Sequence, residues 1–255
     1  MSIKLFAGKA SVTSSQVSYL VLVLVLLASF FVDPTLAQTQ TTGPSTGDLG
    51  ITQTEAAALR DAFVTRLRNA GFTCSLQVPA IVVEDVPSFG QYRPETNTVR
   101  TSNWNLLSQP EKAMFVQLAG PGKQESDARH LFDVAHQWIF IHELGHWWQA
   151  CSGGNAAKSH YQVEYGANRI ALSYWREVNP QVAETMKPVF QAVVDHAPSP
   201  VPPDQSVEDY FNANYETLGP SPRYPWFMSR MNLAAFDEMP GPTFAAALRS
   251  QQRSQ

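Results

Sequence analysis

The sequence predicts an α+β fold, in which a small sheet precedes a block of helices. Apolar residues recur at helical spacing over residues 54–70 and again after residue 126. Between these segments, VPAIVVEDV and NTVRTS are β-branched and apolar, which is typical of strands. The chain has 255 residues and is 44% hydrophobic, so it is long enough for one domain with a substantial core.

The elements before the long apolar helix have clear local signals. Thr52 and Glu55 have the spacing of a capping box, and a helix is expected over residues 54–70, where Gly71 ends it. Strands are expected over residues 77–85 and 98–101, joined by an irregular, hairpin-like connection that is rich in turn residues. Ser108, followed by proline and glutamate, begins a helix that ends near Leu118.

The second half of the chain is mainly helical. Ser126 is expected to cap a long helix that ends near Cys151. Further helices are expected over residues 161–177, 182–196 and 243–249, and the sequence before the last of these is mixed. A proline-rich connection at residues 197–204 is expected to be rigid and to lie inside the domain, which covers residues 52–255.

The first 37 residues have the pattern of a secretory signal peptide. Lys4 and Lys9 precede an apolar run over residues 19–32, and small residues follow at the two positions that a signal peptidase reads. A membrane-spanning helix needs about 20 apolar residues, which is more than this run supplies. We therefore expect cleavage after Ala37, a secreted or periplasmic protein, and no stable membrane span after cleavage. Retention of the segment as an anchor is the alternative.

The charge composition of the chain argues against one class of binding partner. The net charge of -4 comes from sparse charges of both signs, without a basic stripe, which argues against nucleic acid as a partner. Residues 38–51 are polar, contain glycine and proline and lack periodicity, so a flexible linker is expected there.

Cys74 and Cys151 are the only two cysteines. In an exported protein, the oxidising environment favours a disulfide between them. Closing so long a loop would stabilise the fold by about 4 kcal/mol. Two free, buried thiols are the alternative.

The motif that carries chemistry is FIHELGHWWQAC, which contains His142, Glu143 and His146 in an HExxH arrangement. Residues four apart lie on one face of a helix, so both imidazoles can reach one zinc ion while Glu143 lies beside it. Gly145 is unusual inside a helix and costs about 1 kcal/mol relative to alanine, which a close crossing by another helix would explain. A core helix with two hydrogen-bonded histidines is the competing interpretation.

A catalytic zinc ion needs a third protein ligand and an open position for water. The downstream candidates are His160, Glu164, Glu177, Glu184 and His196. Glu164 begins the apolar side of its helix, where small residues would allow a close approach to the histidine helix. Asn168, one turn further on, could orient a ligand histidine through its other ring nitrogen.

The HELGH motif, followed at this distance by EYGANRIA, resembles the gluzincin metallopeptidases, particularly the compact minigluzincin type. The resemblance covers residues 52–177 and implies a zincin-like fold. It implies one zinc ion per chain held by His142, His146 and Glu164, with Glu143 as the general base. It also implies that NTVRTS forms the sheet edge that pairs with a peptide or protein substrate.

The reaction that the resemblance implies is hydrolysis of peptide bonds. Zinc polarises the scissile carbonyl and activates a water, while Glu143 takes up and passes on the proton. A further donor should stabilise the oxyanion, and Tyr215 and Tyr224 are the first candidates, ahead of Arg223. A catalytically inactive, zinc-containing binding or structural module of the same fold is the alternative function.

Other residues near the motif are expected to be structural. His136 falls on a different face of the helix from His142 and is expected to be structural or to face solvent, and His130 is expected on the surface. Trp147 and Trp148 could line a pocket for an apolar side chain, but packing in the core is the expected role.

Overall fold

The computed structural model describes residues 46–154, 158–218, 221 and 223–252. The expected signal peptide and most of the expected linker lie outside this part of the chain. Eight helices are described here: α2 (Thr46–Asn69), α3 (Gln109–Ala119), α4 (Glu125–Ser152), α5 (His160–Val178), α6 (Pro180–His196), α7 (Val207–Leu218), α8 (Tyr224–Phe236) and α9 (Phe244–Arg249). Three strands accompany them: β1 (Ala80–Val83), β2 (Gly90–Arg93) and β3 (Thr98–Thr101). The fold is therefore α+β with mostly helices, as expected.

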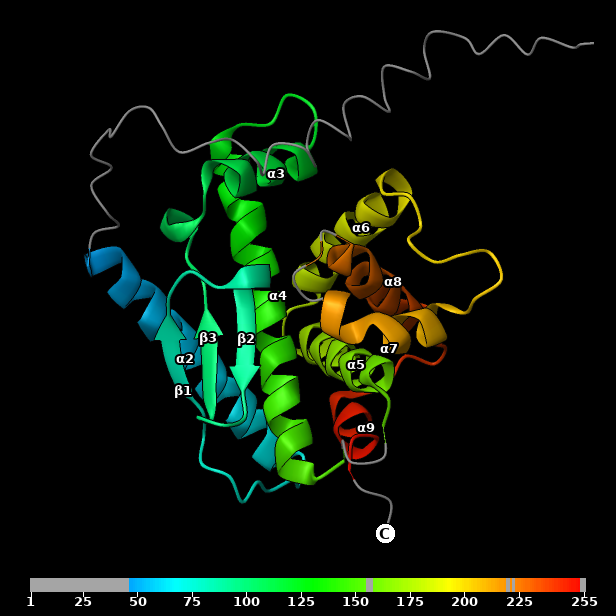
Figure 1. The fold of residues 1–255 in the computed structure, drawn as a ribbon. Coiled ribbons are helices and arrows are strands. Elements are labelled where there is room, and N and C mark those ends of the chain that lie inside the picture. Colours follow the sequence, from blue (N-terminus) through cyan, green and yellow to red (C-terminus); the bar gives the residue numbers. More distant parts are fainter. Residues whose placement is uncertain (1–45, 155–157, 219–220, 222, 253–255) are drawn as a thin grey trace, which may run out of the picture. The chain divides into compact units, whose positions relative to one another are not determined.

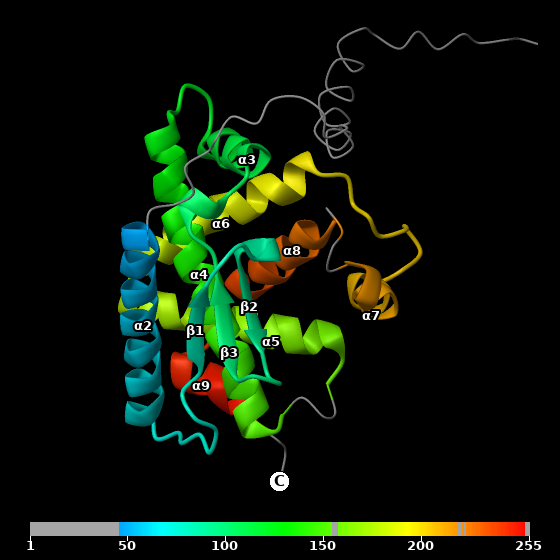
Figure 2. The same ribbon diagram turned by 60° about the vertical axis from the view of Figure 1, so that its left-hand side comes forward.

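Helix α4 separates the sheet from the helical block. Figure 1 shows the strands and α2 on one side of α4 and the helices α5–α9 on the other. The same arrangement can be followed in Figure 2, where α2 lies beside β1 and the strands lie in front of α4. The main hydrophobic core is formed by residues of α2, the sheet, α3–α6, α8 and α9. A second cluster, centred on Phe211 and Phe227, joins α7 to α8.

The sheet has the order β1-β3-β2, with β1 parallel and β2 antiparallel to β3. Two expectations are corrected by this topology. The connection between the two expected strands contains a third strand, β2, so β1 and β3 do not form a hairpin. The segment NTVRTS forms β3, which is paired on both sides, so the expectation that it is the free sheet edge is wrong. The edge nearest α4 is β2.

Most helix boundaries agree with their local signals. Ser108 caps α3, and its own backbone N–H donates a hydrogen bond of 2.7 Å to the Glu111 carboxylate. Helix α2 differs, because it begins at Thr46, eight residues before the expected start. Thr52 therefore lies inside the helix and does not cap it. Helices α7 and α8 were not expected as separate elements in the mixed C-terminal sequence.

No helix within the described ranges is long and apolar enough to cross a bilayer.

Cys74 and Cys151 form the expected disulfide, with their Cα atoms 5.5 Å apart and a sequence separation of 77. Cys151 lies at the end of α4, and Cys74 lies in the connection from α2 to β1. The bridge therefore ties the C-terminal end of the histidine helix to the part of the chain that leads into the sheet.

Replacing Cys74 and Cys151 together by alanine should lower the free energy of unfolding by about 4 kcal/mol, because the unfolded chain regains the freedom of a long loop. Urea denaturation of both forms measures the difference. The group of His142, His146 and Glu164 described below should not be affected, because neither sulfur belongs to it. Two titratable thiols in the denatured, unreduced wild type would contradict the bridge.

His136 is structural, as expected. It is half-buried in α4, its ring stacks on Phe132, and its Nε2 contacts Thr101 Oγ1 of β3. Burial lowers the pKa of His136 to about 4 from its ordinary 6.5. The unfolded chain therefore binds a proton at this residue at a higher pH than the folded protein does.

Stability should fall as the pH is lowered from about 6.5 towards 4, because protonation of His136 favours the unfolded chain. The contribution should be about 2 kcal/mol, after an allowance for partial exposure. His136→Gln keeps a hydrogen-bonding side chain but does not titrate, so its loss of stability over this range, followed by urea denaturation, should be smaller by that amount. Identical pH profiles for the two proteins would contradict the assignment.

Candidate metal centre

His142, Glu143 and His146 lie in the C-terminal half of α4, where the helix is buried between the sheet and α5. The two histidines are one turn apart and therefore share a face. Glu164 lies in the second turn of α5 and is also buried. The site thus combines one segment from each of two neighbouring helices.

Gly145 allows these two helices to approach closely. A Cβ atom at this position would lie 3.2 Å from the Cα of Ala167 and 3.3 Å from its Cβ. The close crossing explains why glycine stands in the interior of a buried helix despite its conformational cost. It also brings Glu164, one turn before Ala167, to the histidine pair.

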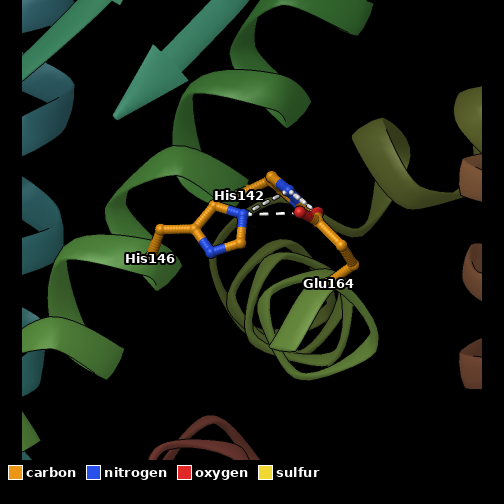
Figure 3. Close-up of side chains that lie close together, drawn as sticks. All are labelled: His142, His146 and Glu164. Atoms are coloured by element: carbon orange, nitrogen blue, oxygen red, sulfur yellow. Dashed lines mark hydrogen bonds and ion pairs between the residues drawn. The ribbon is translucent and has the colours of Figure 1, made fainter. Parts of the chain in front are cut away.

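Three ligand atoms converge at this crossing, as Figure 3 shows. The Nε2 atoms of His142 and His146 are 3.0 Å apart. Glu164 Oε2 lies 3.2 Å from the Nε2 of His142 and 3.3 Å from that of His146. This oxygen is buried and accepts no hydrogen bond from the described part of the chain.

The other ring nitrogens determine the tautomers. His142 Nδ1 lies 2.8 Å from Asn168 Oδ1, and His146 Nδ1 lies 2.9 Å from Gln149 Oε1. An amide oxygen only accepts hydrogen bonds, so each Nδ1 carries a hydrogen and donates it. In the neutral imidazoles, each Nε2 then presents a lone pair to the point that Glu164 also faces.

The electrostatics of the group favour a cation at that point. Burial alone would lower the pKa of His146, but the Glu164 carboxylate outweighs this effect and raises the pKa to about 9. Burial alone would raise the pKa of Glu164, but the two histidines hold it well below its usual range. Without a metal, a proton on His146 Nε2 balances the buried carboxylate, and a metal ion at the same place would replace it.

The geometry fits a metal ion. Zinc binds nitrogen at about 2.0–2.1 Å and oxygen at about 2.0–2.2 Å, which separates neighbouring ligand atoms of a tetrahedron by about 3.3 Å. The three separations of 3.0, 3.2 and 3.3 Å are close to this value. The buried His142, His146 and Glu164 group can therefore hold a metal ion and would leave a fourth position open.

Glu143 is held on the sheet side of α4. Its Oε2 accepts a hydrogen bond of 2.6 Å from the backbone N–H of Tyr92 in β2. Gly90, in the same strand, permits this approach, because a Cβ there would lie 2.6 Å from Ile139 Cγ2 and 3.3 Å from Glu143 Cγ. The carboxylate of Glu143 is buried and lies close enough to His146 to raise its pKa further.

Tyr215 of α7 and Tyr224 of α8 are both brought to Glu164. The Tyr215 hydroxyl donates to Glu164 Oε1 over 3.3 Å. Burial, followed by the Glu164 charge, raises the pKa of both tyrosines, so both hydroxyls stay protonated and remain donors. His160, a candidate ligand, stacks on the Tyr215 ring at 3.9 Å between ring centres and does not join the ligand group.

The remaining candidates lie elsewhere. Glu177 accepts from the Phe244 backbone N–H and pairs with Arg66. His196 donates to the Ala192 carbonyl at the end of α6. Exposed residues that the site does not use are Glu184, Arg223 and His130.

Trp147 and Trp148 are buried in the core, as expected. Their indole N–H groups donate to the backbone carbonyls of Gln77 and Leu248 at 3.1 and 3.0 Å. A cavity of about 610 Å³ beside α4 is lined by residues that include Ser102, Asn103 and His136, and none of the three metal ligands lines it.

Two partners of the site were missed in the sequence. Gln149, three residues after His146 on the same helix, could have been found from its spacing. Tyr92 could not, because it acts through its backbone N–H in a strand that the sequence did not predict.

The chain was compared with models of protein families, with curated proteins and with solved structures, and none of the three comparisons found a match. The assignment of function therefore depends on the arrangement of the site itself.

Proposed function

We propose that the protein is a zinc-dependent metallopeptidase of the gluzincin type, in which His142, His146 and Glu164 hold one zinc ion. The observation that carries the proposal is the convergence of two imidazole lone pairs and a buried carboxylate oxygen, at separations of 3.0 to 3.3 Å. Two histidines and one glutamate, with a fourth position open, are a donor set of catalytic zinc sites.

The neighbouring residues support hydrolysis over a purely structural zinc site. A bound zinc ion would supply a Lewis acid that polarises a carbonyl and lowers the pKa of water. Glu143 is a buried carboxylate that does not belong to the ligand group, and we assign to it the role of accepting a proton from the attacking water and returning it to the leaving nitrogen. The Tyr92 N–H fixes its orientation.

Strand β2 is the proposed binding edge for an extended peptide. The backbone N–H of Tyr92 points away from β3 towards Glu143. The backbone N–H of Gly90, two residues earlier, points in the same direction, because backbone groups in a strand alternate with a period of two. A substrate strand added at this edge would run past Glu143 and bind mainly through its backbone.

Tyr215 and Tyr224 are the proposed donors to the oxyanion of the tetrahedral intermediate. Their protonated hydroxyls lie at Glu164, one of the three proposed zinc ligands, and are donors of the kind that stabilises an oxyanion. In the resting protein they hold the Glu164 carboxylate in place.

The ligand set is tested by metal analysis. Wild-type protein should contain one zinc ion per chain, and His142→Ala, His146→Ala and Glu164→Ala should each lose it and melt at a lower temperature, because metal binding stabilises the folded state. The matched controls are His130→Ala in α4 and Glu184→Ala in α6, which change exposed residues of the same types. A full equivalent of zinc in Glu164→Ala would contradict the site.

The mechanism is tested by Glu143→Gln, which keeps an acceptor for the Tyr92 N–H but cannot take up a proton. It should retain zinc and lose peptidase activity by a factor of about 100 or more. New N-termini in a digest of denatured proteins measure activity without assuming a sequence preference. Zinc-loaded wild type that cuts no peptide would favour the alternative, an inactive zinc-containing module.

A further inference from the structure

The amide of Gln149 controls one of the metal ligands. Gln149 lies one turn after His146 and is completely buried. Its Oε1 is 2.9 Å from His146 Nδ1. Its Nε2 donates to two oxygen atoms, the Val163 carbonyl at 2.7 Å and Gln251 Oε1 at 3.1 Å. Because both of these partners are acceptors, the amide must direct its nitrogen to them and its oxygen to His146.

The direction of this amide decides which nitrogen of His146 faces the metal with a lone pair. If the amide turned over, its NH₂ group would face Nδ1 and favour the tautomer that carries its hydrogen on Nε2. A hydrogen on Nε2 would occupy the atom that faces Glu164 and His142. Every contact that keeps the Gln149 amide oxygen directed at His146 Nδ1 should therefore increase the affinity for the metal ion.

One of these contacts comes from the C-terminal end of the described chain. Gln251 follows α9 and is buried, with 4% of its surface exposed. Its Oε1 also accepts a hydrogen bond of 2.7 Å from the Lys158 ammonium group, and its backbone carbonyl accepts one of 2.9 Å from Ser152. The lysine charge holds this oxygen in place as an acceptor for Gln149.

Two glycines make room for Gln251. A Cβ at Gly154 would lie 1.6 Å from the Gln251 carbonyl oxygen, and a Cβ at Gly166 would lie 2.3 Å from Gln251 Oε1. Neither glycine is required by an unusual φ angle, so the close approach of Gln251 is the reason for both. The ends of α4 and α5 thus form a slot that fits this residue.

We propose that Gln251 is a positioning residue of the metal centre, which orients the ligand His146 through Gln149, so that the metal affinity depends on the docked C-terminal segment. This inference rests on the metal site of the proposed function but not on its peptidase activity.

The test is the zinc dissociation constant of the full chain, measured by competition with a chelating dye. Loss of a direct partner of a ligand histidine weakens metal binding by about 10- to 100-fold, and Gln251 acts one step further out, so we expect about 5-fold weaker binding for Gln251→Leu. Gln251→Asn is shorter by one methylene group and should also lose the contact with Gln149. Gln251→Glu keeps an acceptor oxygen and should bind zinc like the wild type.

The matched control is Gln252→Leu, the same change at the next residue, which is exposed. The melting temperature of each zinc-free variant separates an effect on the metal site from a general loss of stability. The proposal holds if Gln251→Leu and Gln251→Asn bind zinc more weakly, while Gln251→Glu and Gln252→Leu do not. Should Gln251→Leu fail to fold, Gln251→Asn and Gln251→Glu still give the comparison.

Equal zinc affinity in Gln251→Asn and the wild type would overturn the proposal, as would an equal loss in Gln251→Glu or Gln252→Leu. These outcomes leave the proposed function intact. A wild type that binds no zinc would overturn the proposed function first, and this inference with it, whereas a zinc-loaded wild type without peptidase activity would overturn only the function.

Discussion

The close crossing of α4 and α5 is the constraint on which the site depends. At Gly145 the two helices approach so closely that a Cβ atom on this residue would lie 3.2 Å from the Cα and 3.3 Å from the Cβ of Ala167. Both histidines lie within one turn of this point on α4, and Glu164 lies one turn before it on α5. A larger residue at either position would move the carboxylate away from the imidazoles, so one backbone contact sets the geometry of all three ligands.

The same crossing buries the charge of the Glu164 carboxylate, which a positive charge must balance. It buries a carboxylate against two imidazoles whose Nδ1 hydrogens are already committed to Asn168 and Gln149. An uncompensated buried charge is strongly unfavourable, and the group can be balanced only by a proton or a metal ion at the two Nε2 atoms. The stability of the α4–α5 pair and the occupancy of the site are therefore linked, and the contacts around both helices serve the fold and the site together.

The sequence predicted the ligand group because its signals are local. His142 and His146 are joined by helical spacing. Glu164 was one of five candidates, favoured by its place on the small-residue side of the next helix, and the family resemblance singled it out. Strand β2 could not be predicted in this way, because Gly90–Arg93 is short, polar and surrounded by turn residues. Its conformation depends on pairing with β3 and on the fit of Gly90 against α4. The parallel pairing of β1 with β3, and the approach of Tyr215 and Tyr224 to Glu164, also depend on contacts between distant segments.

The parts of the site are supported from opposite sides of α4. Glu143 is oriented by the sheet, through the Tyr92 N–H, whereas the three ligands are oriented by the helical block, through Asn168, Tyr215 and the Gln149–Gln251 pair. Helix α4 carries both Glu143 and the two histidines, so it connects the two parts of the site. A shift of β2 would therefore change the position of the proposed base with little effect on the ligand atoms, and a shift of the C-terminal segment would do the reverse. The disulfide is important for this arrangement, because it holds the end of α4 to the part of the chain that leads into the sheet. It therefore helps to keep the sheet, which orients Glu143, in a fixed position relative to the helix that carries the histidines.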